Sequence, residues 1–94
     1  MDDAKQAARL CGLNLLLQLK QACGGTLDYV KRCVKLTVYM KCDSNFQDHA
    51  QVANGVSDLM VEVFGDIGHH SRTAVGAISL PSDTAVEVDA IFEV

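Results

Sequence analysis

The last third of the chain constrains the fold most strongly, because it contains two runs with the period-two pattern of β-strands. Small and apolar residues occupy alternate positions in residues 72–81, and apolar residues alternate with acidic ones in residues 85–94. This alternation indicates strands with one buried and one exposed face. Pro81 and the polar residues 82–84 lie between the two runs and favour a turn. We therefore predict a β-hairpin in which Glu87 lies opposite about Ile78.

A helical pattern opens the chain. Asp2 or Asp3 is suited to cap a helix that runs to about Cys23, and Gly24-Gly25 supplies a left-handed stop. At 100° per residue, one side of this helix carries Ala4, Ala8, Cys11, Leu15, Leu19 and Ala22. A second apolar ridge, formed by Leu10, Leu13 and Leu17, lies beside the charged side. A helix on one sheet does not bury two such surfaces, so we expect the ridge to contact another subunit.

The middle of the chain combines a strand and a second helix. Residues 30–40 alternate with period two, and the predicted core face carries Val30, Val34, Leu36, Val38 and Met40. A helix is predicted from Phe46 or Asp48 to Phe64, with Gly65 as its stop. Asn54-Gly55 inside it is typical of a hairpin turn, but the longer apolar period favours the helix.

These elements predict the order α-β-α-β-β in a single domain over residues 1–94. Two helices on one face of a small sheet form an α+β two-layer sandwich. If strands 30–40 and 72–81 are parallel, the crossover between them should be right-handed. The uncovered sheet face and the exposed strand edges favour association with further copies.

Charge and composition exclude several classes of function. The 94 residues carry 8 Lys and Arg against 12 Asp and Glu, a net charge of −4, which opposes nucleic-acid binding through phosphate neutralisation. No apolar run approaches the ~20 residues of a membrane span, and the acidic start is unlike a secretory signal. We predict a cytoplasmic protein without membrane association.

Cysteine and histidine positions do not predict a metal, disulfide or cofactor site. The four cysteines lie inside helix and strand patterns without framework spacing, so free thiols are expected at Cys11, Cys23, Cys33 and Cys42. His69-His70 has no third ligand at a supporting spacing, and solvent-exposed loop histidines are expected. Phosphate-binding and cofactor-binding motifs are also absent, so we expect neither a metal nor a cofactor.

Arg72 is the most informative polar residue of the chain. It follows a glycine-containing loop, and its planar donor fork suits a carboxylate or phosphate. Small neighbours leave room for a ligand beside it, namely Ser71, Thr73, Ala74 and Gly76. Glu87 is the acidic counterpart on the next strand. The alternative interpretation is that Arg72 and Glu87 are simply solvent-exposed charges of strand ends.

Three segments in order resemble a known family. They are residues 34–39, residues 54–65, and Arg72-Thr73-Ala74-Val75-Gly76 followed by Leu80-Pro81 and residues 86–90. Together they resemble the YjgF/RidA family of reactive-intermediate (enamine/imine) deaminases, in particular its endoribonuclease L-PSP, YjgF/chorismate-mutase-like branch. Family members begin with several strands before their first helix. Since this chain starts at that helix, we expect an N-terminally shortened domain.

The resemblance implies a chorismate-mutase-like fold, a homotrimer with clefts between subunits, and a deaminase that acts on small 2-imino or 2-enamino acids. It implies that Arg72, with Thr73 and Ala74, binds the substrate carboxylate, and that the catalytic acid Glu87 orients water. Ala74 stands where family members often have cysteine, and the aromatic residue of the N-terminal strands has no counterpart, so a cleft that binds carboxylates but hydrolyses little is expected. The alternatives are a non-catalytic ligand-binding protein, an endoribonuclease and, by fold analogy alone, a chorismate-mutase-like activity.

Overall fold

The computed structural model describes residues 2–94. Its helices and strands are α1 (Asp2–Ala22), β1 (Arg32–Lys41), α2 (His49–Phe64), β2 (Ser71–Ala77) and β3 (Val86–Glu93), with short 3-10 turns at Gly65–Gly68 and Pro81–Asp83. The predicted order α-β-α-β-β and the α+β class are confirmed. Helix α1 ends before Gly24 and Gly25, which adopt φ values of 79° and 101°, as expected for a glycine stop.

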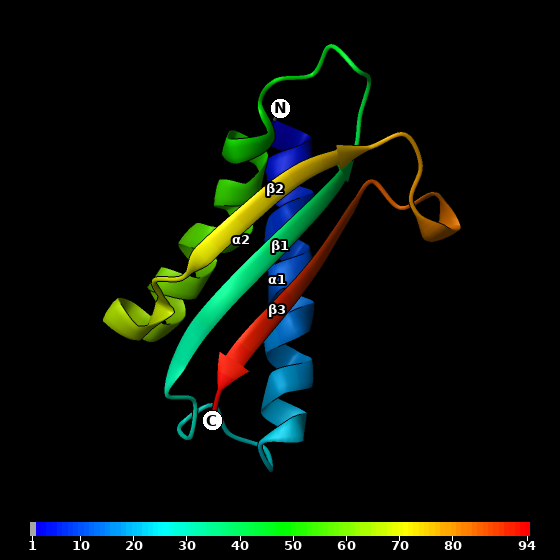
Figure 1. Cartoon of the computed structure of the whole chain (residues 1–94). Coiled ribbons are helices and arrows are strands. Elements are labelled where there is room, and N and C mark those ends of the chain that lie inside the picture. Colours follow the sequence, from blue (N-terminus) through cyan, green and yellow to red (C-terminus); the bar gives the residue numbers. More distant parts are fainter. Residues whose placement is uncertain (1) are drawn as a thin grey trace.

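The predicted hairpin between the last two strands is wrong, because β1 lies between them. The strand order is β2-β1-β3, with β2 parallel and β3 antiparallel to β1 (Figure 1). Strand β1 carries the most deeply buried strand residues, Cys33, Leu36, Val38 and Met40. Because β1 is the central strand, its backbone N–H and C=O groups are hydrogen-bonded along both edges. Strands β2 and β3 flank its apolar side chains. The turn at Pro81–Asp83 exists, but the loop that contains it crosses the end of β1.

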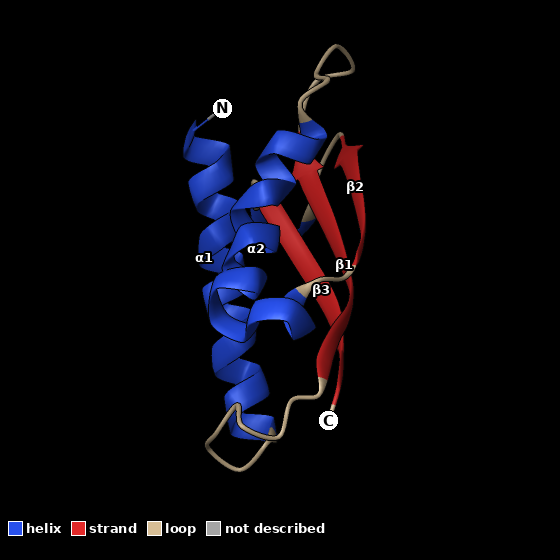
Figure 2. Cartoon of the chain, turned by 90° about the vertical axis from the view of Figure 1, so that its left-hand side faces the viewer, coloured by secondary structure: helices blue, strands red, loops and turns tan. Residues whose placement is uncertain are grey.

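The structure has two layers. Both α-helices cover one face of the sheet, and among residues 2–94 no helix covers the other face (Figure 2). The core lies between the layers and is built mainly from β1 and α2, with Leu36, Val38, Val52, Val56 and Met60 almost fully buried. The face without helices is called the open face below.

Two glycines allow α1 and α2 to approach closely. A Cβ atom on Gly55 would collide with the Lys5 carbonyl oxygen, and one on Gly12 would come within 2.8 Å of Val56 Cγ2. Glycine is therefore required at position 55 by helix packing. This explains why Asn54-Gly55 lies in a helix, as predicted, although the pair is typical of a hairpin turn.

The buried side of α1 differs in part from the predicted one. Its most buried residues are Ala8, Gly12 and Leu16, so the buried side is turned towards Gly12 and Leu16 and away from the predicted Ala22. The cause is α2, which provides a second packing surface beside the sheet. The ridge predicted to be uncovered is exposed, with fractions of 60% for Leu10, 42% for Leu13 and 59% for Leu17.

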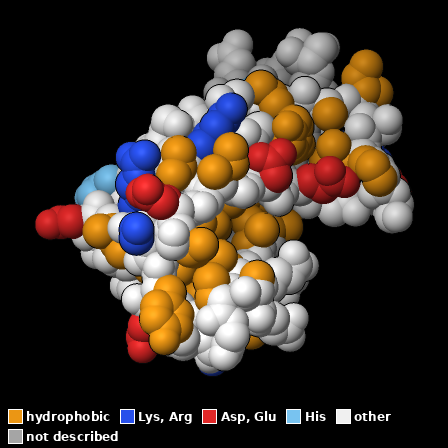
Figure 3. Space-filling view, turned by 60° about the horizontal axis from the view of Figure 1, so that its bottom comes forward, with side chains coloured by type: hydrophobic (Ala, Val, Ile, Leu, Met, Phe, Trp, Pro, Cys, Tyr) orange, Lys and Arg blue, Asp and Glu red, His pale blue; other side chains and the backbone are white. Residues whose placement is uncertain are grey.

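The beginning of β1 also departs from the predicted alternation. A register irregularity between Cys33 and Lys35 turns the Cys33 side chain into the core, where it is 1% exposed, while Val34 is only half-buried. Such a bulge shifts the side-chain parity by one position. Figure 3 views the nearby end of the molecule, where hydrophobic side chains gather between charged ones. Within residues 2–94 no helix has the length and apolar character needed to cross a membrane; the cellular compartment stays a prediction.

Candidate functional site

Arg72 is anchored on α2. It lies on the edge strand β2, opposite Leu36 of β1, so its side chain starts on the helix-covered face of the sheet. Its Nη1 atom donates to Asn54 Oδ1 over 2.6 Å and to Ser57 Oγ over 3.3 Å. Because Asn54 and Ser57 are three residues apart in α2, they lie on one side of the helix, and both accept hydrogen bonds from the same guanidinium nitrogen.

Arg72 also lines an open pocket. Within residues 2–94 no carboxylate forms an ion pair with Arg72, and Nη1 alone carries its hydrogen bonds. The pocket has a volume of about 500 Å³ and is lined by the polar residues Asn54, Ser57, Asp58, His69, His70 and Arg72, with Val61 beside them. Nε and Nη2 thus form a donor edge available to a planar anion.

The turn after α2 brings His70 against this helix. Gly68 allows the reversal, since a Cβ atom there would collide with the backbone of Met60. His70 Nδ1 lies 2.6 Å from the Gly68 carbonyl oxygen, and His70 Nε2 lies 2.8 Å from Ser57 Oγ. A carbonyl oxygen only accepts, so the proton of neutral His70 is on Nδ1, and Nε2 accepts from the Ser57 hydroxyl.

This cluster was missed in part by the sequence interpretation. His70 is half-buried and hydrogen-bonded instead of being solvent-exposed as expected. Ser57 is only 9% exposed and lies between apolar neighbours on the buried side of α2. The sequence did contain a signal for this cluster, a serine inside an apolar helical stripe. Because buried polar groups require hydrogen-bond partners, such a serine predicts a polar side chain beside it.

The other predicted site residues lie apart from the Arg72 pocket. Ala74 is half-buried and packs against the core, while Thr73 points to the open face and is exposed. Glu87 is paired with Tyr39, whose neighbours Val38 and Met40 face the helices, so Glu87 also lies on the open face.

Arg72 and Glu87 do not share a site within one chain. Arg72 is in register with Leu36 and Glu87 with Tyr39, so the two are separated by three residues along the strands and by two strand spacings. Their backbones are therefore about 14 Å apart, and their side chains start on opposite faces. The two residues meet only if a second copy of the chain supplies one of them.

The open face is acidic near Glu87. The negative charge of Asp89 raises the pKa of Tyr39, as do partial desolvation, a hydrogen bond to Asp89 and the charge of Glu87. Val75 and Ile91 add exposed apolar surface to the same face. The open face thus combines apolar and acidic groups.

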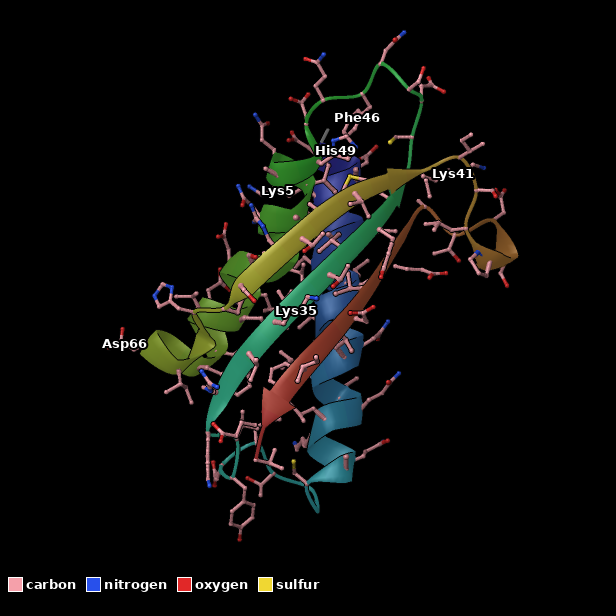
Figure 4. The ribbon with its side chains drawn as sticks, in the orientation of Figure 1. Lys5, Lys35, Lys41, Phe46, His49 and Asp66 are labelled. Atoms are coloured by element: carbon pink, nitrogen blue, oxygen red, sulfur yellow. The ribbon has the colours of Figure 1, made fainter. Side chains whose placement is uncertain are left out.

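A separate Cys–His pair lies at the far end of β2 from His70. Cys42 Sγ is 3.7 Å from His49 Nε2, and Gly76 leaves the space for them, since a Cβ atom there would come within 2.6 Å of the sulfur. Figure 4 shows His49 and Phe46 near the top of the molecule and Asp66, just before the turn that leads to His70, at the left-hand side. The described residues contain no group of three or more potential metal ligands.

Comparison with known proteins gives matches over almost the whole chain. The family model described as "YjgF/chorismate_mutase-like, putative endoribonuclease" matches residues 1–93. Protein TCP17 of Trypanosoma cruzi is 48% identical over 92 residues, which cover 97% of this chain and 57% of that protein.

Two solved structures are also similar. The crystal structure of Atu1372 from Agrobacterium tumefaciens, a protein described as having unknown function, superposes with a TM-score of 0.97 at 41% identity, over 99% of this chain and 59% of that one. The structure of a protein from Shewanella oneidensis, described as a "putative endoribonuclease", has a TM-score of 0.94 at 32% identity, over 99% of this chain and 61% of that one. The chain therefore spans about three fifths of the length of the relatives it matches.

Proposed function

This chain belongs to the YjgF/chorismate-mutase-like family, and from that premise we propose that it binds small carboxylate-bearing 2-imino or 2-enamino acids at Arg72 and acts on them as an enamine/imine deaminase. The observation that supports the proposal is the anchoring of Arg72. Asn54 and Ser57 hold Nη1, so the donors facing the pocket keep a fixed direction. A carboxylate held by two parallel hydrogen bonds would place an adjacent C=N group over the pocket.

The proposal includes a homo-oligomer, with a homotrimer as first choice. The open face carries exposed apolar and acidic side chains, and Leu10, Leu13 and Leu17 form a separate exposed ridge on α1. Burial of either surface between copies would remove apolar area from water. Glu87 acts as the water-orienting acid in this proposal, and it reaches an Arg72 pocket only across a subunit boundary.

Carboxylate binding is tested first and separately from catalysis. A small 2-keto acid, the product class of the reaction, is titrated into the wild type and Arg72→Met by calorimetry or NMR. Loss of a charge-assisted bidentate pair is expected to weaken binding about 10- to 100-fold. Arg32→Met is the matched control, because Arg32 is an exposed strand arginine whose ion pair is with Glu93. It should leave the affinity unchanged.

Catalysis is tested with 2-imino acids generated in situ by an amino-acid oxidase. Faster release of ammonia with the wild type than with Arg72→Met or Glu87→Gln supports the deaminase. Binding that depends on Arg72 without faster ammonia release selects the non-catalytic ligand-binding protein. Absence of both binding and ammonia release contradicts the proposal.

An endoribonuclease is the second candidate, and one arrangement favours it. His69 and His70 line the same pocket as Arg72, so a phosphodiester held by the arginine would lie beside imidazoles able to transfer protons. The net charge of −4 opposes binding to a long RNA. RNA cleavage that persists in Arg72→Met would be assigned to a contaminant. Cleavage that is lost in Arg72→Met but retained in Arg32→Met would select the nuclease.

A further inference from the structure

The hydrogen bonds around Ser57 fix the direction of its proton. Arg72 Nη1 only donates, so Ser57 Oγ accepts from it over 3.3 Å. His70 carries its proton on Nδ1 towards Gly68, so Nε2 accepts from Ser57 over 2.8 Å. The serine hydroxyl is thus aimed at an unprotonated imidazole nitrogen.

This arrangement is that of an activated serine nucleophile. A nucleophilic serine needs a base within about 2.6–3.2 Å and a third group that orients the base. His70 is the base, and the Gly68 carbonyl oxygen takes the orienting place that a carboxylate has in a Ser-His-Asp triad. Ser57 and His70 both line the open pocket, so a small molecule can reach the pair.

Arg72 supplies the electrostatic component. Its positive charge lies next to Ser57 Oγ and favours the ionised form of the hydroxyl. The same guanidinium faces the pocket in which the oxygen of a tetrahedral intermediate would carry its negative charge. Fixed donors at such a position contribute strongly to acyl transfer.

We propose that Ser57 and His70 form a catalytic pair that hydrolyses small activated esters in the Arg72 pocket. Ser57 Oγ bonds to the acyl carbon while its proton moves to His70 Nε2 and the carbonyl electron pair becomes an oxyanion beside Arg72. The bond to the leaving alcohol then breaks, and His70 returns the proton to that alcohol. Water attacks the acyl-serine with His70 as base, which releases the acid and restores the Ser57 hydroxyl.

This activity goes beyond the deaminase and does not depend on it. Ester hydrolysis requires Ser57 and His70, whereas carboxylate binding requires Arg72. The two uses share the guanidinium, so a bound 2-keto acid should inhibit acylation of Ser57. Such inhibition would link the two activities to one pocket.

The test uses p-nitrophenyl acetate and a fluorophosphonate probe on the full chain. Peptide mapping of the wild type by mass spectrometry should locate both the acyl group and the phosphonyl adduct on Ser57. Labelling and hydrolysis should fall about 100-fold or more in Ser57→Ala and in His70→Gln. His49→Gln is the matched control, since His49 lies beside Cys42 at the far end of β2, and it should label at the wild-type rate.

Adducts on other residues, no adduct at all, or equal hydrolysis by the wild type and Ser57→Ala would overturn the proposal. The mapping needs no variant, so this result stands even if a substitution prevents folding.

Discussion

Replacement of Gly55 by alanine tests the helix packing that positions Asn54 and Ser57. The new Cβ atom would collide with the backbone oxygen of Lys5, which moves only if α1 moves. Overpacking costs up to about 3 kcal/mol, and the better helix propensity of alanine returns about 1 kcal/mol. Gly55→Ala should therefore lower the free energy of unfolding by about 2 kcal/mol.

Gly12→Ala is the matched comparison on the opposing helix. Its new Cβ atom would meet side-chain atoms, Val56 Cγ2 at 2.8 Å and Leu59 Cδ2 at 2.9 Å. Because side chains rotate more easily than a backbone shifts, the overpacking cost of Gly12→Ala should be about 1 kcal/mol. The better helix propensity of alanine offsets this cost by about the same amount. The expected change in stability is close to zero.

Thermal and urea unfolding followed by circular dichroism measure both variants. A loss of about 2 kcal/mol corresponds to a fall in Tm of about 8–16 °C for a chain of this size. Gly55→Ala should also weaken 2-keto acid binding, because displacement of α2 moves both anchors of Arg72. A Gly55→Ala protein that is as stable as the wild type would refute the close helix contact.

Two further predictions concern ionisation and association. Burial raises the pKa of Cys33 from 9.0 to about 11. The neutral thiol therefore stabilises the fold below pH 9, and this contribution is lost as pH rises towards 11. Between pH 8 and 10.5, the free energy of unfolding of the wild type should fall by about 2 kcal/mol relative to that of Cys33→Val, and a difference independent of pH would contradict a buried thiol. Light scattering should give a trimer mass for the wild type and a smaller mass for Leu13→Glu, with the exposed Gln18→Glu as control; a folded wild-type monomer would contradict the subunit-sharing site.

Most of the secondary structure follows from local pattern. The 3.6-residue apolar period and the glycine stops locate both helices within a few residues, because these signals act over one or two helical turns. Strand segments follow from alternation in the same way. Two strand segments depart from the prediction. Strand β2 ends at Ala77, before the predicted end at residue 81, and the irregularity at Cys33 shifts the alternation at the start of β1 without a local sequence signal.

The candidate site could be predicted only in part. Arg72 is identifiable because a guanidinium beside small residues suggests an anion site, and its resemblance to the family arginine supports this. Its partners Asn54 and Ser57 are 18 and 15 residues away in sequence. They become neighbours of Arg72 only when β2 docks beside α2.

The sequence by itself determined most of the helix and strand segments, their order and the family resemblance. Tertiary structure decided which strands pair, because alternation specifies the buried side of a strand but not its neighbour. Burial of β1 on both edges outweighed the local hairpin between β2 and β3. The tertiary fold also placed Glu87 on the face opposite to Arg72 and brought Ser57 against His70, since both results depend on contacts between elements.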